Sequence, residues 1–212
     1  MLTALALTGV LALPAGAVPA PPERSAEEVV RRVEERHRTL RDLTADFVQT
    51  YRSGLLGRQI TEKGTVSLKP PGRMRWEYQA PERKTFVSDG RTFYFYVPAD
   101  RQVITRPQDD QRGLPAQLLS GRTDVLSQFT AKDDEGAPAG LRRVRLVPKK
   151  ADAEVEWAAI DVDGDARIRG IVIVDAQGNR SQFRFDNVRE NVGIREDVFR
   201  FVVPRGVEIV TG

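Results

Sequence analysis

The residues of this sequence that could bind a metal ion are the aspartates of Asp161-Val-Asp-Gly-Asp165. Carboxylates at alternate positions before a glycine are typical of the opening of a calcium-binding loop. Such a loop needs a glutamate at its twelfth position to complete the coordination, and Val172 stands there. We therefore interpret the segment as a hairpin turn that carries aspartates. With one histidine and no cysteine in the chain, no zinc site is predicted either.

Nucleophilic catalysis would have to use His37, the single histidine, because the chain has no cysteine. His37 stands between Arg36 and Arg38 in a segment with helical periodicity, so it is predicted to be a surface or boundary residue. A G-x-S-x-G motif and a glycine-rich phosphate loop are both missing. We therefore predict that the protein is not an enzyme and needs no cofactor.

The run Arg73-Met-Arg-Trp-Glu-Tyr78 combines basic and aromatic residues, as surfaces that stack nucleic-acid bases do. Strand alternation explains the run equally well, since it sends the arginines to one face and the aromatic rings to the other. The net charge is only +3, with 33 basic and 30 acidic residues, so no polyanion-binding surface is indicated. Nucleic acid is not a predicted partner.

The elements that must position these residues follow from capping and periodicity. Ser25 and Glu28 form a capping-box pattern, which predicts an amphipathic helix of about 18 residues beginning there. Two short helices are predicted at 113–120 and 123–129, followed by a polar loop at 133–140. Strands are predicted at 44–51, 64–68, 73–78, 84–88, 91–97, 102–105, 141–147, 155–161, 167–174, 180–188 and 198–203, with a short last strand near Val207.

This order predicts an α+β fold in which one curved, mostly antiparallel sheet is covered by helices. The helices carry too few apolar residues to form a layer of their own, so they must lie on the sheet.

The first 17 residues are apolar and uncharged, and they are too short to span a membrane comfortably. Ala15-Gly16-Ala17 offers the small-x-small pattern that signal peptidase cleaves. We predict a signal peptide at 1–17, cleaved near Ala17, and a single domain at 18–212. The basic start of a signal peptide is missing, so a true gene start further upstream or an uncleaved anchor stays open. Without cysteine the chain cannot form disulfides or carry a lipid on an N-terminal cysteine.

Several motifs in collinear order resemble the outer-membrane lipoprotein carrier family (LolA). They are Ala45-Asp-Phe-Val-Gln49, the segment from Lys69 to Pro81 with its Trp76-Glu-Tyr78, Val87-Ser-Asp-Gly90, Thr92-Phe-Tyr-Phe-Tyr-Val-Pro98, and Phe199 to Gly206. The resemblance implies an incomplete, strongly curved antiparallel barrel of about eleven strands under a lid of three helices. It also implies a periplasmic, monomeric shuttle that accepts lipoproteins from an inner-membrane ABC-type transporter and passes them to an outer-membrane receptor.

Two positions depart from the family pattern. Pro70 stands where members commonly carry a basic residue linked to cargo transfer, and Lys69 beside it is the predicted substitute. Met74 stands where many members have another large apolar residue, and a methionine side chain is compatible with acyl chains.

We expect the cargo's acyl chains to bind on the concave face of the sheet, beneath the helices. The residues predicted to line this site are Phe47, Leu68, Met74, Trp76, Tyr78, Tyr94 and Tyr96 from strands and Leu118, Leu119, Val125 and Leu126 from helices. For each of them ordinary core packing is the alternative. Other functions left open are a carrier or sensor of another amphiphile, such as a glycolipid or mislocalised lipoprotein, a receptor-like acceptor, and an adhesion or scaffolding domain.

Overall fold

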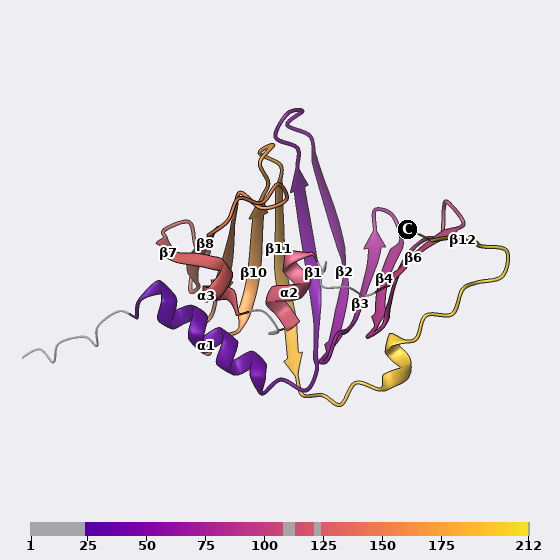
Figure 1. The fold of residues 1–212 in the computed structure, drawn as a ribbon, viewed down its shortest axis with the longest axis horizontal. Coiled ribbons are helices and arrows are strands. Elements are labelled where there is room, and N and C mark those ends of the chain that lie inside the picture. Colours follow the sequence, from indigo (N-terminus) through magenta and orange to yellow (C-terminus); the bar gives the residue numbers. More distant parts are fainter. Residues whose placement is uncertain (1–23, 108–112, 121–123, 212) are drawn as a thin grey trace, which may run out of the picture.

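A computed structural model describes residues 24–107, 113–120 and 124–211, and the predicted signal peptide lies outside this part. One open sheet of twelve strands organises these residues (Figure 1). Its order is β12-β6-β5-β4-β3-β2-β1-β11-β10-β9-β8-β7. The β1–β6 half contains β1 (Leu43–Arg52), β2 (Gln59–Lys69), β3 (Arg73–Ala80), β4 (Lys84–Asp89), β5 (Thr92–Val97) and β6 (Gln102–Pro107), and β12 (Glu208–Thr211) adds to its edge. The other half contains β7 (Phe129–Asp134), β8 (Arg142–Pro148), β9 (Trp157–Val162), β10 (Ile168–Val174) and β11 (Arg180–Glu190).

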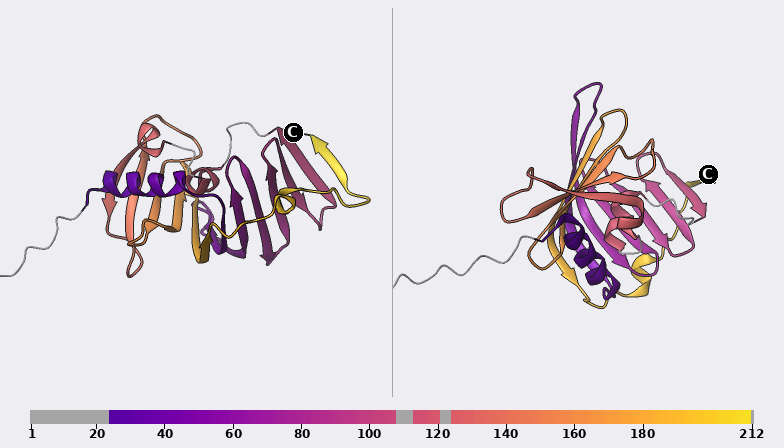
Figure 2. Two further views of the ribbon diagram at one scale, coloured as in Figure 1. Left: turned by 90° about the horizontal axis from the view of Figure 1, so that it is seen from below. Right: turned by 60° about the vertical axis from the view of Figure 1, so that its left-hand side comes forward.

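Three helices lie inside the curve of the sheet, and together they are called the lid: α1 (Ala26–Arg38), α2 (Leu114–Ser120) and α3 (Val125–Gln128) (Figure 2). The lid contacts β7, β8 and β2. The sheet face that it covers is called the inner face, and the opposite one the outer face. In the described part of the chain, no helix is long and apolar enough to cross a membrane.

The predicted capping box starts α1. The Ser25 side chain accepts a hydrogen bond from the Glu28 N–H at 3.2 Å, and Glu28 accepts one from the Ser25 N–H at 2.7 Å. The helix has 13 residues instead of about 18. The apolar spacing continues to Leu40 and Leu43, which are buried, but the chain turns at Thr39 to enter β1.

The C-terminal segment differs most from the prediction. The expected strand at 198–203 is instead a short 3-10 helix, η1 (Glu196–Phe199), followed by extended chain without ladder pairing. This segment crosses the outer face, where Arg75 donates to the Val198 carbonyl at 3.2 Å and Phe199 is buried. Its path brings β12 beside β6 in the parallel direction. The sheet is therefore an open, mixed sheet of twelve strands, which corrects the expected incomplete antiparallel barrel of about eleven strands.

The segment that contains α3 and β7 also differs from the prediction. Residue 123 of the helix predicted at 123–129 lies outside the described part, and α3 has only four residues because Phe129 already begins β7. Phe129 is buried in the core, and β7 pairs with β8 as far as Asp134, so its last two residues lie in the stretch predicted as a polar loop.

Gly64 lies at a close approach between strands of the sheet. The pairing of β2 with β3 shifts register between Lys63 and Gly64, which marks a bulge. A Cβ atom on Gly64 would lie 1.9 Å from the Glu77 carbonyl oxygen and 2.9 Å from the ring of Phe47. Only glycine allows β3 and the Phe47 ring to approach β2 this closely.

We expect Gly64→Ala to lower the free energy of unfolding by about 3 kcal/mol or more, because main chain must move to admit the methyl group. Urea unfolding followed by tryptophan fluorescence measures this. Gly164→Ala is the matched control, since a Cβ atom there has no neighbour within 4 Å. Equal stability of the two variants would contradict the close approach at Gly64.

Candidate functional site

A continuous row of aromatic rings crosses the inner face, and it is called the aromatic row. Phe183 and Phe185 of β11 stack on each other at 6.2 Å and contact Trp76 of β3. Phe47 of β1 meets Trp76 edge-on at 5.2 Å and Tyr78 at 4.8 Å. The row continues onto β4 and β5, where Tyr78 contacts Phe86 at 5.7 Å, and Phe86 stacks on Phe95 at 4.4 Å and lies 6.0 Å from Phe93.

Most of the residues predicted from the sequence gather at this site. Phe47, Trp76 and Tyr78 belong to the aromatic row itself. The others beside the row or in the lid are Leu68, Met74, Leu118, Leu119 and Val125, which are buried, and Leu126, which is half-buried. All of these side chains pack into one apolar cluster with the inner face.

Tyr94 and Tyr96 do not belong to this site, and their predicted position on the concave face is wrong. Their partners in β4 are Val87 and Thr85, whereas Phe95 between them pairs with Phe86 of the aromatic row. Both tyrosines lie on the outer face, where their ring centroids are 5.2 and 5.8 Å from that of Phe201. The run Thr92 to Val97 is apolar at every position after the first, so alternation alone cannot show which side faces inward.

Sequence reasoning consequently missed Phe86, Phe93 and Phe95, as well as Phe183 and Phe185 on β11. The available signal was the pairing of neighbouring strands. Once Trp76 is taken as inward, antiparallel registers carry that orientation to Phe86 and then to Phe95.

Exposure changes along the aromatic row. Phe47 of β1 and Phe185 of β11 are 1% and 2% exposed. Phe86, Phe93 and Phe95, on strands that have no substantial contact with the lid, are only half-buried. Within the described residues the row is thus packed at one end and half-exposed at the β4–β5 end, and this half-exposed end is called its open end.

A polar group of side chains borders the row toward the β1–β2 hairpin. The Tyr78 hydroxyl donates to the Gln49 side-chain oxygen at 2.6 Å, and burial raises the pKa of this phenol above its ordinary value. Lys84 pairs with Glu62 at 2.7 Å and places its ammonium 4.3 Å from the Tyr78 ring centre. These contacts satisfy the polar atoms without placing an unpaired charge on the apolar surface.

Helix α1 holds the other two helices through buried polar groups. The Glu34 carboxylate accepts a hydrogen bond from the Val125 N–H of α3 at 2.7 Å. His37 hydrogen-bonds to the main chain of Leu118 in α2. His37 is only 4% exposed, so its predicted surface position is wrong. It follows Val30 and Val33 on the buried stripe, while Arg36 turns away to Glu190 and Arg38 is exposed.

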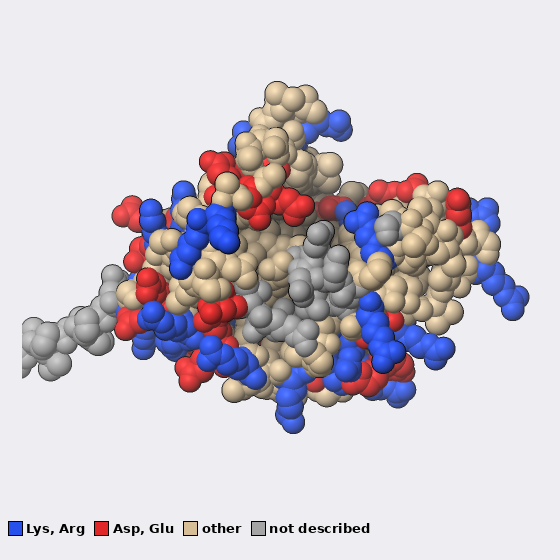
Figure 3. Space-filling model, viewed as in Figure 1, with Lys and Arg blue, Asp and Glu red and all other residues tan. Residues whose placement is uncertain are grey.

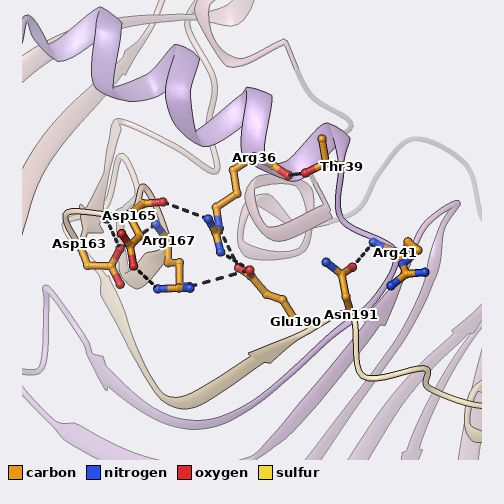
Figure 4. Close-up of polar contacts among 8 residues, drawn as sticks. All are labelled: Arg36, Thr39, Arg41, Asp163, Asp165, Arg167, Glu190 and Asn191. Atoms are coloured by element: carbon orange, nitrogen blue, oxygen red, sulfur yellow. Dashed lines mark hydrogen bonds and ion pairs between the residues drawn. The ribbon is translucent and has the colours of Figure 1, made fainter.

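The end of α1 is fixed to β11 and to the β9–β10 turn (Figure 4). Arg36 donates to Glu190 with its Nε at 3.0 Å and to the Asp165 carbonyl at 3.2 Å. The Arg41 N–H donates to the Asn191 side chain at 2.8 Å. The lid is therefore attached at its α1 end, on the side of the sheet away from β4 and β5.

The aspartates at 161–165 form the predicted hairpin turn between β9 and β10. Asp163 accepts hydrogen bonds from the N–H groups of Asp165 and Arg167 at 3.0 Å. Asp161 makes a buried bidentate pair with Arg143 at 2.6 and 2.8 Å. Among the described residues no cluster suited to a metal ion is found.

Lys69 points to the outer face. Its ammonium donates to the Ile194 carbonyl at 2.6 Å and pairs with Glu196 at 2.8 Å, so it holds the C-terminal segment against the sheet. The surface seen in Figure 3 carries basic and acidic groups side by side, without a large region of one sign.

The family model described as "Outer membrane lipoprotein carrier protein LolA" matches residues 38–202. An outer-membrane lipoprotein carrier protein of Neisseria gonorrhoeae is 31% identical over 171 residues, which are 80% of each chain. One of Methylococcus capsulatus is 33% identical over 171 residues, 80% of this chain and 81% of its own. The protein belongs to the outer-membrane lipoprotein carrier family, LolA, and is a non-enzymatic transport protein.

The fold is also found among solved structures. An uncharacterized conserved protein from Thermus thermophilus superposes with a TM-score of 0.57 at 15% identity, over 88% of this chain and 99% of its own. This similarity concerns the fold alone.

The lowered pKa of His37 predicts how the free energy of unfolding depends on pH. Burial, assisted by Arg36, lowers the pKa of His37 to about 4, against the opposing effects of Glu190 and Leu118. The unfolded chain therefore binds this proton first as the pH falls below about 6.5, and the folded state loses stability down to pH 4. The loss is on the order of 3 kcal/mol and should be absent from His37→Leu.

Urea unfolding at about pH 7.5, 6, 5 and 4.5 tests this for both proteins. Three carboxylates whose pKa is lowered, Asp134, Asp175 and Asp197, titrate mainly below this range and affect both proteins equally. A parallel decline in the two proteins would show that His37 is not the group responsible.

Proposed function

We propose that this protein binds the acyl chains of lipoproteins at the open end of the aromatic row and carries them through the periplasm from the inner to the outer membrane. The observation that supports this most is the change in exposure along the row, from packed core beneath the lid to half-buried phenylalanines on β4 and β5. Family membership supports lipoprotein cargo. An ABC-type lipoprotein-releasing transporter and an outer-membrane receptor are the partners that we propose.

Partial burial suits a carrier that must also release its cargo. Each acyl methylene that leaves water contributes about 0.8 kcal/mol, so full burial of a chain with about fifteen of them would contribute about 12 kcal/mol. Complete burial of two or three such chains would exceed known non-covalent affinities. A half-buried aromatic surface holds each chain more weakly, and no chemical energy is then needed for release.

Phe95→Ser should weaken the binding of a fluorescent fatty acid about tenfold or more, because it removes a ring from the open end of the row. Tyr94→Ser is the matched control. It is adjacent in the sequence and also half-buried, but it faces Phe201 on the outer face, so affinity should stay within about threefold. Displacement titrations on folded variants measure this, and equal losses would contradict the site.

The alternative function is a carrier or sensor of another amphiphile. Saturable binding of a glycolipid in preference to acyl chains would favour that alternative.

We further propose that Lys69 acts in cargo transfer through its hold on the C-terminal segment. Lys69→Met should leave fatty-acid affinity unchanged, since the side chain lies on the outer face. It should slow the transfer of a bound lipoprotein to isolated outer membranes severalfold. Transfer at the unaltered rate would leave Lys69 a purely structural residue.

A further inference from the structure

The β1–β2 hairpin carries an exposed apolar tip that the proposed cargo site does not use. Residues 53–58, called the hairpin tip, project beyond the other loops at one end of the sheet (Figure 1). Leu55 is 91% exposed and Leu56 69%. No other large hydrophobic side chain in the described part of the chain is as exposed as Leu55. Exposure of two adjacent leucines contributes nothing to folding, so it calls for a ligand.

The hairpin tip is held in place. The Ser53 N–H donates to the Arg58 carbonyl at 2.9 Å and the Gly57 N–H donates back to the Ser53 carbonyl at 3.0 Å. The Gly54 N–H donates to the Asn179 side chain of the β10–β11 turn at 3.0 Å. A Cβ atom on Gly54 would lie 2.4 Å from the Gln177 carbonyl oxygen, so the two turns are in close contact. The leucines are therefore displayed on a supported hairpin.

Basic residues flank the leucines. Arg52 and Arg58 are both exposed and stand at the base of the hairpin tip. The nearest acidic residues have partners lower on the hairpin or in the neighbouring turn. Glu62 pairs with Lys84, and Asp175 accepts hydrogen bonds from Gln177 and Asn179. Figure 3 shows the end of the molecule uncharged, with basic groups beside it and acidic groups below.

The inner side of this hairpin connects the tip with the aromatic row. Tyr51 pairs with Ile60 one step below the tip, on the same face as Phe47. Ile60 is 46% exposed. Next along the strand come Gln49 and Glu62, and then the row itself. The tip thus stands at the end of the sheet, next to the inner-face residues of this hairpin. Any surface that the tip contacts is therefore brought close to the inner face.

We propose that the hairpin tip docks the protein on a lipid bilayer with anionic headgroups. Two leucines on a two-stranded hairpin are too small an area for a stable protein interface, which needs about 800 Å² from each partner. The same two side chains suffice for shallow insertion into hydrocarbon, while Arg52 and Arg58 remain at the level of the headgroups. Docking is reversible, because it depends on few side chains. It extends the proposed function, since the carrier itself contacts the membrane surface.

Vesicle flotation of the whole protein tests the proposal. Binding to phosphatidylethanolamine–phosphatidylglycerol vesicles is expected to exceed binding to phosphatidylcholine vesicles. The double variant Leu55→Ser, Leu56→Ser should bind at least tenfold more weakly, because each inserted leucine accounts for about tenfold. The control is Val202→Ser, Ile209→Ser, which removes two exposed apolar side chains elsewhere, at 69% and 56% exposure, and should bind normally. Arg52→Gln with Arg58→Gln should abolish the preference for anionic vesicles.

The lack of native cysteine permits a direct probe of insertion. Leu55→Cys and Val202→Cys are each labelled with the fluorophore NBD and mixed with the same vesicles. A blue shift is expected for the label at position 55 and none for the label at 202. Fatty-acid displacement by the double leucine variant should be unchanged, which separates failure of docking from failure of the cargo site. Equal vesicle binding by both double variants, or binding of the tip only to a lipid-free outer-membrane protein, would overturn the proposal.

Discussion

The close approach of Phe47 and β3 to Gly64 is the contact on which the other features depend. It forms at a bulge in β2, and it places Phe47 against both Trp76 and Tyr78 at the bend of the sheet. A side chain at Gly64 would separate β2 from β3. The ring stack would then be interrupted between the half of the sheet beneath the lid and the half that carries Phe86 and Phe95. The continuity of the aromatic row therefore depends on the glycine at this position.

The two faces of the sheet are covered in different ways, and this difference creates the site. The inner face is covered by a lid that contacts β7, β8 and β2 and that buried polar groups attach through α1. On the outer face, the C-terminal segment covers β3 and β4 and its Phe201 stacks on Tyr94 of β5. The inner side of β4 and β5 receives neither cover within the described part of the chain. Their phenylalanines stay half-buried, which is the condition for an apolar ligand that binds and leaves.

The β1–β2 hairpin carries a second apolar surface, the hairpin tip, which is separate from the aromatic row. Its polar residues Gln49 and Glu62, with Lys84 of β4, separate the aromatic row from the tip, and each has a partner. The apolar surface is thus divided between the proposed cargo site and the proposed membrane-contact site. In the proposed docking, the carrier meets a membrane with the end of the molecule that bears the hairpin tip, next to the inner face.

The sequence by itself determined the class of protein, the order of most strands, the capping of α1 and the lack of enzymatic groups. Each of these depends on local spacing or on motifs in order along the chain. It also predicted that Phe47, Trp76 and Tyr78 lie on the inner face, because polar residues alternate with Trp76 and Tyr78 in β3. Only the tertiary structure decided that Phe95 faces inward and Tyr94 outward, because all residues of β5 are apolar or small and only pairing with β4 fixes the side. It likewise buried His37 and laid 198–203 across the outer face, since both outcomes depend on partners distant in the sequence.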